Sequence, residues 1–270
     1  MTEVLPAMPA RAKREERRLS VRLASDPSDL LAVQKLRWQV FFTERGAAAV
    51  TQASEAATLL DHDAYDDLCD HLLVIDEAAE GRVVGTYRLL RESVAAKHSG
   101  FYSSGEYDLS LLTGGGWRQA GELLELGRSC VLPPYRTSGT IALLWRGIAD
   151  YIALHGIALM FGCASFHGTD PLTHAPALSW LYHHHLAPAG MRPRVLPGTG
   201  VSMNMLPSGA FDERQAMLDL PPLIKGYLRT GAKFGDGAFV DHAFNTVDVC
   251  VVMPVDRIAS RYATRFSVAA

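Results

Sequence analysis

Apolar and polar positions alternate along the first third of the chain in patterns that predict short elements. Residues 19–24 (LSVRLA) alternate apolar and polar side chains, which is typical of a strand with one buried face. Residues 26–29 supply helix-starting side chains, and the apolar positions that follow as far as Phe41 recur at helical spacing. Residues 71–76 and 82–91 are apolar runs on either side of a Glu-Gly turn, so they predict two strands.

Strands and helices continue to alternate through the rest of the chain. Residues 122–132 (ELLELGRSCVL) predict a strand that ends at two prolines, and a long apolar to amphipathic helix follows over 139–155. The uncharged run 158–166 has the pattern of a buried central strand, and residues 170–185 predict another helix. Two further strands are expected near the C-terminus, at 201–206 and 247–255.

This order predicts one α/β domain with a mixed sheet, because no internal repeat and no linker interrupts it. We expect residues 1–18 to form a basic, flexible arm and residues 19–270 to form the domain. A variable insertion is expected at about 205–245, and residues 97–117 are read as a Gly/Ser-rich loop.

Composition agrees with a globular protein and excludes several other classes. The 270 residues are 48% apolar and 20% charged, which is enough apolar material for a buried core and too much for a disordered chain. A formal net charge of −3 argues against a nucleic-acid partner. The four cysteines form no CxxC pair, and no 18-residue uncharged run occurs.

These features favour a cytoplasmic protein without a membrane span. The N-terminus also lacks the apolar core of a signal peptide. The segment 11–18 (RAKREERR) is strongly basic, which suits anionic lipid or an acidic protein as well as it suits a solvated chain end. The charge pattern alone leaves these alternatives open.

Most of the common cofactor and nucleophile motifs are absent. The chain has no GxGxxG, no GxxxxGK[ST] and no GxSxG, so a dinucleotide fold, nucleotide hydrolysis and a serine hydrolase have no support. Three consecutive histidines, 183–185, could suggest a metal site. Adjacent helical positions point about 100° apart, so the three rings cannot converge on one ion, and no metal site is predicted.

The stretch from Val131 to Ile141 (VLPPYRTSGTI) is the most informative in the sequence. A strand ends at two prolines, and Arg136 precedes the start of a long helix. Helix N-termini bind phosphate through free amides and the positive end of the dipole. The candidate phosphate ligands are Arg136, Ser138, Gly139 and Thr140. The same pattern also fits an ordinary strand-to-helix turn.

The VxPxxRxxG pattern of this stretch resembles the acyl-carrier binding turn of the GCN5-related N-acyltransferase (GNAT) superfamily. The resemblance implies an α+β domain with a mixed, mostly antiparallel central sheet flanked by helices, followed by a C-terminal extension. Ile141 stands where the superfamily usually has Gly or Ala. This departure favours a donor with one phosphate, such as phosphopantetheine, over coenzyme A.

Further blocks resemble two branches of that superfamily. Four of them occur in the order of the acyl-homoserine lactone synthases: Arg37-x-x-Val40-Phe41, Tyr65-Asp66, Arg88-Leu89-Leu90 and Glu125-x-x-Arg128. The blocks ELGRSCV and PPLIKGYLR are similar to those of the ornithine-acyl-carrier-protein N-acyltransferases. The resemblance implies transfer of a (3-hydroxy)fatty acyl group from acyl carrier protein to the α-amino group of ornithine, which gives lyso-ornithine lipid.

The resemblance also implies roles for individual side chains. Glu125 is the first candidate for proton acceptor, Asp66 is the second, and Tyr182 is the candidate to protonate the leaving thiolate. The remaining acidic and basic candidates are expected to bind the acceptor: Asp61, Asp63, Arg37, Arg88 and Arg128. No cofactor is expected to be bound permanently, since the donor is the acyl-phosphopantetheine of acyl carrier protein. Peripheral contact with an anionic membrane is the further expectation.

Other interpretations of the same residues remain open. Glu125 could form a structural salt bridge with Arg88 or Arg128, the segment 61–67 could be a solvated acidic loop, and Tyr182 could serve packing alone. At the level of function, the alternatives are an acyl-homoserine lactone or other N-acyl amino acid synthase, and a coenzyme A-dependent N-acetyltransferase. An inactive thioester-binding module would require loss of Glu125 or of the phosphate turn, and both are present.

Overall fold

A computed structural model describes residues 17–47, 59–115 and 120–256. Most of the basic arm expected at 1–18 therefore lies outside the described residues. The strands are β1 (Leu19–Leu23), β2 (Asp70–Asp76), β3 (Arg82–Arg91), β4 (Tyr107–Asp108), β5 (Glu122–Val131), β6 (Ile157–His167), β7 (Arg194–Val195), β8 (Gly200–Val201), β9 (Lys233–Asp241) and β10 (Thr246–Pro254). The α-helices of the described residues are α1 (Pro27–Trp38), α3 (Glu92–Ala95), α4 (Ser110–Thr113), α5 (Ser138–His155), α6 (Ala175–His185), α7 (Glu213–Asp219) and α8 (Pro222–Thr230).

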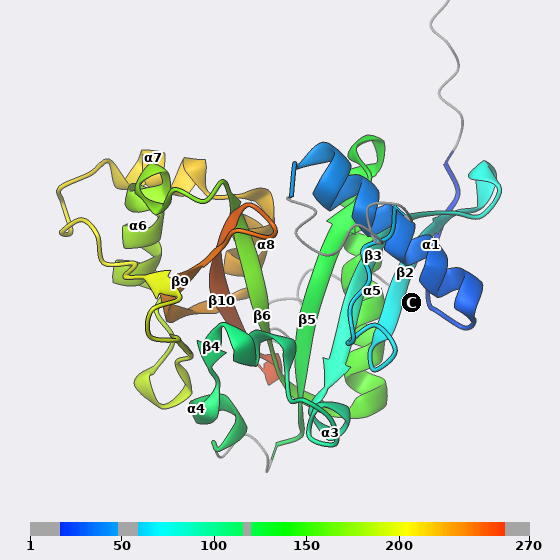
Figure 1. The fold of residues 1–270 in the computed structure, drawn as a ribbon, viewed down its shortest axis with the longest axis horizontal. Helices are drawn as coiled ribbons and strands as arrows, with labels where there is room; N and C mark the ends of the chain where they lie inside the picture. Colours follow the sequence, from blue (N-terminus) through cyan, green and yellow to red (C-terminus); the bar gives the residue numbers. More distant parts are fainter. Residues whose placement is uncertain (1–16, 48–58, 116–119, 257–270) are drawn as a thin grey trace, which may run out of the picture.

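The strands form one sheet in the order β1-β2-β3-β5-β6-β10-β9-β7-β4, with β8 paired to β9. Among the described strands, only the pairs β5–β6 and β7–β9 are parallel. The expected mixed, mostly antiparallel sheet is therefore confirmed. Pairing of β5 with β6 covers only Glu122–Glu125, after which the two strands diverge (Figure 1).

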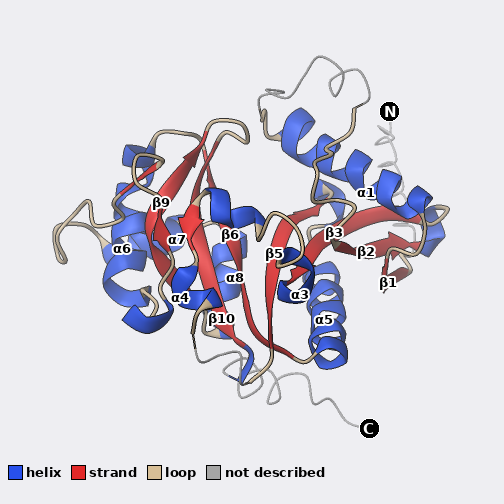
Figure 2. Cartoon of the chain, turned by 60° about the horizontal axis from the view of Figure 1, so that its bottom comes forward, coloured by secondary structure: helices blue, strands red, loops and turns tan. Residues whose placement is uncertain are grey.

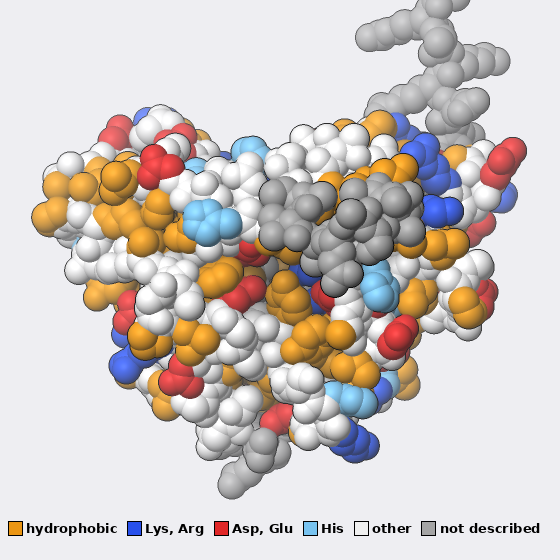
Figure 3. All heavy atoms as spheres, viewed as in Figure 1, with side chains coloured by type: hydrophobic (Ala, Val, Ile, Leu, Met, Phe, Trp, Pro, Cys, Tyr) orange, Lys and Arg blue, Asp and Glu red, His pale blue; other side chains and the backbone are white. Residues whose placement is uncertain are grey.

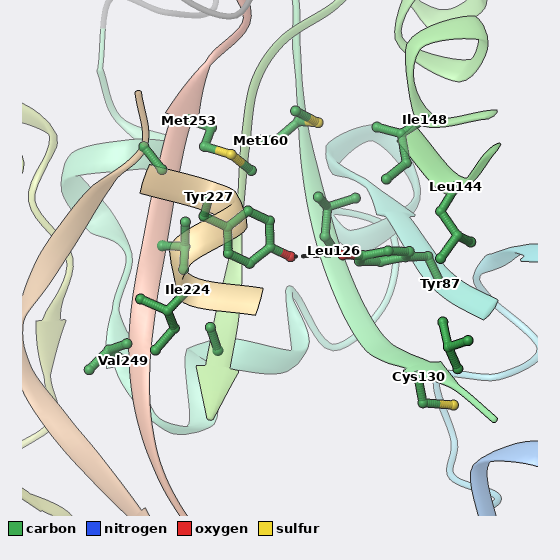
Figure 4. Packing of buried hydrophobic residues seen from close by; sticks show 14 of the residues in the cluster. Tyr87, Leu126, Cys130, Leu144, Ile148, Met160, Ile224, Tyr227, Val249 and Met253 are labelled. Atoms are coloured by element: carbon green, nitrogen blue, oxygen red, sulfur yellow. Dashed lines mark hydrogen bonds between the residues drawn. The ribbon is translucent and has the colours of Figure 1, made fainter. Parts of the chain in front are cut away.

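Helices cover both faces of this sheet. On the β1–β3 side, α1 and α5 lie on opposite faces (Figure 2). On the α5 face, α8 packs beside α5, since the rings of Trp145 and Tyr227 meet edge to face. Figure 4 shows Tyr227 of α8 pointing toward Tyr87 of β3, and their hydroxyls lie 3.2 Å apart. This hydrogen bond links β3 with α8, which contacts β6 on the other side of the divergence of β5 and β6.

Local capping explains where the two main helices begin. Asp26 accepts hydrogen bonds from the amides of Ser28 and Asp29 at the start of α1. Thr137 accepts one from the amide of Thr140 at the start of α5, and α5 ends at Gly156, whose φ of 62° lies in the left-handed region. Both helices follow the sequence-based expectation.

Two expectations for the strands require correction. The strand expected at 201–206 is reduced to the two residues of β8, and the sheet instead contains β9, which was not expected. The sequence KFGDGAFVD conceals β9 because two glycines interrupt its apolar run. Packing restricts both of them, since a Cβ added to Gly237 would lie 2.2 Å from the Val195 side chain and one added to Gly235 would lie 2.9 Å from the Pro193 carbonyl oxygen.

The region expected as an insertion at about 205–245 thus contributes α7, α8 and a strand of the main sheet. The Gly/Ser-rich loop at 97–117 likewise contains β4 and α4. Within the described residues, no helix combines the length and the apolar character that crossing a bilayer requires.

Candidate active site at the divergence of two strands

A bulge in β5 changes the direction of the Arg128 side chain, which belongs to one of the predicted site residues. Thr86 pairs with Cys130 and Arg88 pairs with Gly127, so Arg128 and Ser129 together oppose Tyr87. Arg128 has a φ of 50°, a left-handed value that few residues other than glycine adopt. Such bulges bend a strand and redirect a side chain, and they are common beside active sites.

The redirected guanidinium of Arg128 lies between two aromatic rings. Its central carbon is 4.8 Å from the centre of the Tyr102 ring and 4.5 Å from that of Phe244. It also pairs with Asp61 at 3.2 Å and with Asp63 at 2.9 Å. Burial opposes its charge, but the carboxylates beside it raise the pKa of Arg128 above its usual range. Arg128 is therefore a fixed cation, and 11% of its side chain is exposed.

Arg128 belongs to an arginine–aspartate cluster, which consists of Arg37, Arg88, Arg128, Asp61, Asp63 and Asp66. Arg37 pairs with Asp66 at 2.6 Å and with Asp61 at 2.8 Å. Arg88 pairs with Asp63 at 2.6 Å and with Asp66 at 3.1 Å. The three cations therefore balance the three anions, and each aspartate contacts two arginines.

This balance changes the roles expected for the acidic residues. The carboxylate of Asp66 is buried, and although burial opposes its charge, Arg37 and Arg88 hold the pKa of Asp66 below its usual range. Asp66 is consequently a poor proton acceptor, contrary to the role expected from the sequence. Arg37 is fully buried, so its side chain organises the cluster without reaching a substrate.

Glu125 occupies the point at which β5 leaves β6. Its Oε2 accepts a hydrogen bond from the Tyr102 amide, and its Oε1 accepts bonds from the amide and hydroxyl of Ser103. Burial raises the pKa of Glu125, although these three donors favour its charged form. Among the described residues, no ion pair joins Glu125 to Arg88 or Arg128, so the structural salt bridge considered above is not formed.

The hydroxyl of Ser103 extends this network to residues that the sequence did not single out. It lies 3.6 Å from the Cys163 sulfur, and Cys163 donates to Oε2 of Glu106 at 3.0 Å. Glu106 is buried, and burial raises the pKa of Glu106 to about 8, with the nearby Asp248 carboxylate adding to the shift. No spacing in the sequence connects Glu106 or Asp248 with Glu125, because the three residues come from separate elements.

The predicted phosphate ligands surround the start of α5. The Thr140 amide is used by the Thr137 hydroxyl at 3.3 Å, and the Thr140 side chain is buried. In the described part of the chain, the amides of Ser138 and Gly139 have no such partner, and both residues are exposed. Arg136 is beside them, held by Glu44 at 2.6 Å and 2.7 Å. The turn thus presents two amides and one arginine, but not the Thr140 amide.

The structure does not bring Tyr182 to this network. The tyrosine lies on α6, where it packs against the main hydrophobic core and its ring meets that of His183. No hydrogen bond or ring contact joins it to Glu125, Ser103 or Ser138 within the described residues. The packing interpretation of Tyr182 therefore fits its surroundings.

The three neighbouring histidines do not share a polar partner among the described residues. His183 bonds the Leu206 carbonyl at 2.9 Å, and His184 lies 3.2 Å from Glu213. The rings of His184 and His185 both contact the Trp180 ring in tilted arrangements. Their rings diverge as the helical geometry requires.

The chain is similar in sequence to a known domain family and to curated relatives. The acetyltransferase (GNAT) domain family matches residues 36–146. An L-ornithine N(alpha)-acyltransferase of Brucella abortus (strain 2308) is 47% identical over 248 residues, which cover 90% of this chain and 87% of that protein. An L-ornithine N(alpha)-acyltransferase of Rhodobacter capsulatus is 44% identical over 246 residues, which cover 90% of this chain and 92% of that protein.

Solved structures are more distantly similar. The acyl-homoserine lactone (AHL) synthase LasI aligns with a TM-score of 0.49 and 16% identity, over 92% of this chain and 96% of that one. FeeM, an N-acyl amino acid synthase from uncultured soil microbes, aligns with a TM-score of 0.44 and 11% identity, over 91% and 96% of the two chains.

Proposed function

The chain belongs to the L-ornithine N(alpha)-acyltransferases, a family of GNAT-type acyltransferases, and we propose that it acylates the α-amino group of ornithine from an acyl thioester. The product of this reaction is lyso-ornithine lipid. We further propose that the acyl group is a (3-hydroxy)fatty acyl chain carried by the phosphopantetheine of acyl carrier protein. The observation that supports this most directly is that β5 carries Glu125 at the divergence and leads, at its other end, into the phosphate turn.

The reaction requires a neutral amine and a place for its proton. The amine nitrogen attacks the thioester carbonyl, the C–N bond forms, and the C–S bond breaks to release a thiolate that takes up a proton from water. We assign the amine proton to Glu125 through Ser103. The Ser103 hydroxyl accepts the proton from the amine as it donates its own proton to Glu125.

Burial suits Glu125 to this role. A carboxyl group with a raised pKa holds a proton more readily than an exposed one at neutral pH. The three hydrogen bonds from Tyr102 and Ser103 fix its position, so little reorganisation accompanies the proton transfer.

For the donor, we propose that the amides of Ser138 and Gly139 and the Arg136 side chain bind the phosphopantetheine phosphate. The first turn of α5 offers its free amides and the positive end of the helix dipole. Arg136 forms an ion pair with Glu44, so the phosphate must displace the Glu44 carboxylate when it binds. The side chain of Ile141 is 44% exposed at the same turn, which leaves less room for the second phosphate of coenzyme A.

For the acceptor, we propose that Arg128 binds the α-carboxylate of ornithine. Arg128 is the most exposed arginine of the arginine–aspartate cluster, and the rings of Tyr102 and Phe244 hold its guanidinium in place. Asp63 forms ion pairs with both Arg128 and Arg88, so it helps to fix the position of Arg128. An arginine suits this contact because its planar fork matches a carboxylate.

A reconstituted reaction tests the function. Purified protein is incubated with L-ornithine and either 3-hydroxyacyl carrier protein, the saturated acyl carrier protein, or the same acyl group on coenzyme A, and products are measured by mass spectrometry. We expect acyl-ornithine from the carrier-protein donors and much less from coenzyme A. Equal turnover with coenzyme A would contradict the proposed donor, and an acyl-homoserine lactone from S-adenosylmethionine would contradict the proposed acceptor.

A further inference from the structure

Two buried carboxylates, Glu106 and Asp248, lie next to the proposed transfer site without a cation. Glu106 is 7% exposed and Asp248 is 6% exposed. In the described residues, neither forms an ion pair with a lysine, an arginine or a histidine. A carboxylate this deeply buried is costly unless a positive charge or several hydrogen bonds accompany it.

Asp248 lies on a strand of the sheet, and Glu106, which directly precedes β4, contacts the same face of the sheet through Cys163. Asp248 of β10 pairs in register with Ser165 of β6, and Cys163 is two residues before Ser165 on the same face. The Cys163 thiol donates to Glu106 at 3.0 Å. Tyr107, which follows Glu106, donates its hydroxyl to the backbone carbonyl of Asp248 at 2.7 Å.

The carboxylate of Asp248 hydrogen-bonds with Ser165, but one of its two oxygens has no partner among the described residues. Its Oδ1 atom is buried and forms no hydrogen bond within the described structure. Burial raises the pKa of Asp248 to about 6, and the neighbouring Asp241 carboxylate opposes its charge as well. Asp248 in turn is the charged neighbour that most raises the pKa of Glu106. Asp248 therefore makes Glu106 harder to ionise, and a cation placed between the two would favour the charged form of both.

The arginine–aspartate cluster forms no ion pair with Glu106 or Asp248 within the described residues, and the charge of Arg128 only partly offsets the burial of Asp248, whose pKa stays raised. Each of its aspartates contacts two arginines and is neutralised by them. The acidic residues that the sequence suggested for a cationic acceptor are therefore occupied. Glu106 and Asp248 remain as acidic side chains beside the site that have no ion-pair partner among the described residues.

A chain of contacts connects this pair with Glu125. The Ser103 hydroxyl donates to Glu125 and lies 3.6 Å from the Cys163 sulfur, which contacts Glu106. Ser103 and Glu106 thus contact the same side chain, which places Glu106 close to the proposed proton relay. Figure 3 shows acidic and basic side chains set back among hydrophobic ones near the middle of this face.

We propose that Glu106 and Asp248 bind the side-chain ammonium of the acceptor, and that this contact selects a diamino acid over an amino acid with a neutral side chain. This inference rests on the proposed function and names the residues that give it its acceptor specificity. One ammonium group offers three hydrogen-bond donors and one positive charge, which match two acidic side chains and the free Oδ1 of Asp248.

The test compares L-ornithine with L-norvaline, which has the same carbon chain without the side-chain amine. Steady-state kinetics are measured for both with a saturating acyl carrier protein donor, and product is counted by mass spectrometry. In the wild-type protein we expect kcat/KM for ornithine to exceed that for norvaline by about 100-fold or more, because an unpaired buried site rejects the analogue. In Glu106→Gln and Asp248→Asn this preference should fall by at least about tenfold, through a higher KM for ornithine.

The control variant is Asp150→Asn, which removes an exposed carboxylate on α5, across the sheet from the site. Its preference for ornithine should equal that of the wild type. Norvaline turnover serves as the check on folding, since it should survive in both test variants.

An unchanged preference in both test variants would overturn the inference, as would equal loss of activity with both amino acids. A wild-type protein that makes no acyl-ornithine would overturn the proposed function instead. A wild-type protein that acylates both amino acids equally well would leave the function standing and remove the ammonium site.

Discussion

At the scale of single residues, the site is defined by which carboxylates have partners. Asp66 is held by two arginines and keeps its charge, whereas Glu125 is held only by neutral donors. The two residues are therefore suited to different tasks, although the sequence presents both as acids near arginines. An ion pair lowers the pKa of a carboxyl group, and burial among neutral donors raises it.

Glu125→Gln and Ser103→Ala should both reduce acyl transfer through kcat. Glu125→Gln removes the proton acceptor, so we expect kcat to fall by about 100-fold or more. Ser103→Ala removes the relay hydroxyl and should give a smaller loss in kcat. The KM values for donor and acceptor should change little, and single-turnover rates measure the chemical step directly.

Ser104→Ala is the matched control, because Ser104 is the exposed neighbour of the relay serine. Glu125→Gln also places an amide group opposite the Tyr102 amide, so its melting temperature is measured alongside. Wild-type kcat in a folded Glu125→Gln protein would refute the proton-acceptor role.

At the scale of elements, the hydrogen bonds at the start of α5 decide which of its amides can bind a ligand. The Thr140 amide is consumed by the cap of its own helix, which leaves Ser138 and Gly139 for a ligand. Arg136 is positioned by the Val131 carbonyl at 3.0 Å and by Glu44, so it is aligned with the turn before any donor arrives.

Substitutions in the Arg136–Glu44 pair should move the donor KM in opposite directions. Arg136→Ala removes a phosphate contact, and we expect the KM for acyl carrier protein to rise by about tenfold with little change in kcat. Glu44→Gln removes the competing carboxylate and should lower that KM. The control is Arg146→Ala on the exposed side of α5. A higher KM in Glu44→Gln would show that the ion pair is needed for donor binding.

Gly237 should be essential to β9. A Cβ there would lie 2.2 Å from the Val195 side chain, and φ is +90°, so Gly237→Ala adds both a clash and backbone strain. We expect a loss of about 2 kcal/mol or more in the free energy of unfolding, measured by urea denaturation. Gly209→Ala is the control, since its φ is +81° but nothing lies within 4 Å. Equal losses in the two variants would show that strain, and not packing, accounts for the effect.

At the scale of the whole molecule, the buried acids make stability depend on pH. Glu106 has a pKa raised from 4.5 to about 8 in the folded protein, so the folded state binds a proton that the unfolded state releases. Its contribution to the free energy of unfolding is therefore complete below about pH 4.5 and is lost as the pH rises through about 8. Asp248 acts in the same direction, with a pKa raised from 3.8 to about 6.

Glu106→Gln should remove much of this dependence. The variant stays neutral at every pH, so its stability relative to the wild type should be greater at pH 8.5 than at pH 5.5, by on the order of 1–3 kcal/mol. Urea denaturation at the two pH values measures the difference. The same stability difference at both values would contradict the buried, uncompensated state of Glu106.

Contact with the membrane also belongs to the whole molecule. We propose that this enzyme works in the cytoplasm and meets the inner membrane face through the basic segment 11–18, which lies largely outside the described residues. Its charge suits anionic lipid, and the acyl product of the reaction is amphiphilic.

The sequence by itself determined most of the elements, the mixed domain and the chemistry of its family. Hydrophobic periodicity and capping residues are local properties, so α1, α5 and the main strands could be predicted from them. The blocks around Glu125 and Arg136 are contiguous and carry the resemblance to acyltransferases. What remained hidden was β9, because the need for its two glycines arises only from the close approach of Pro193 and Val195.

Only the tertiary structure decided which charges are free. It pairs Asp61, Asp63 and Asp66 with three arginines from α1, β3 and β5, and this removes them as sites for a cationic substrate. It also brings Glu106 and Asp248 together from segments that are far apart in the sequence. Charge compensation depends on distance in space, and spacing along the chain does not report that distance.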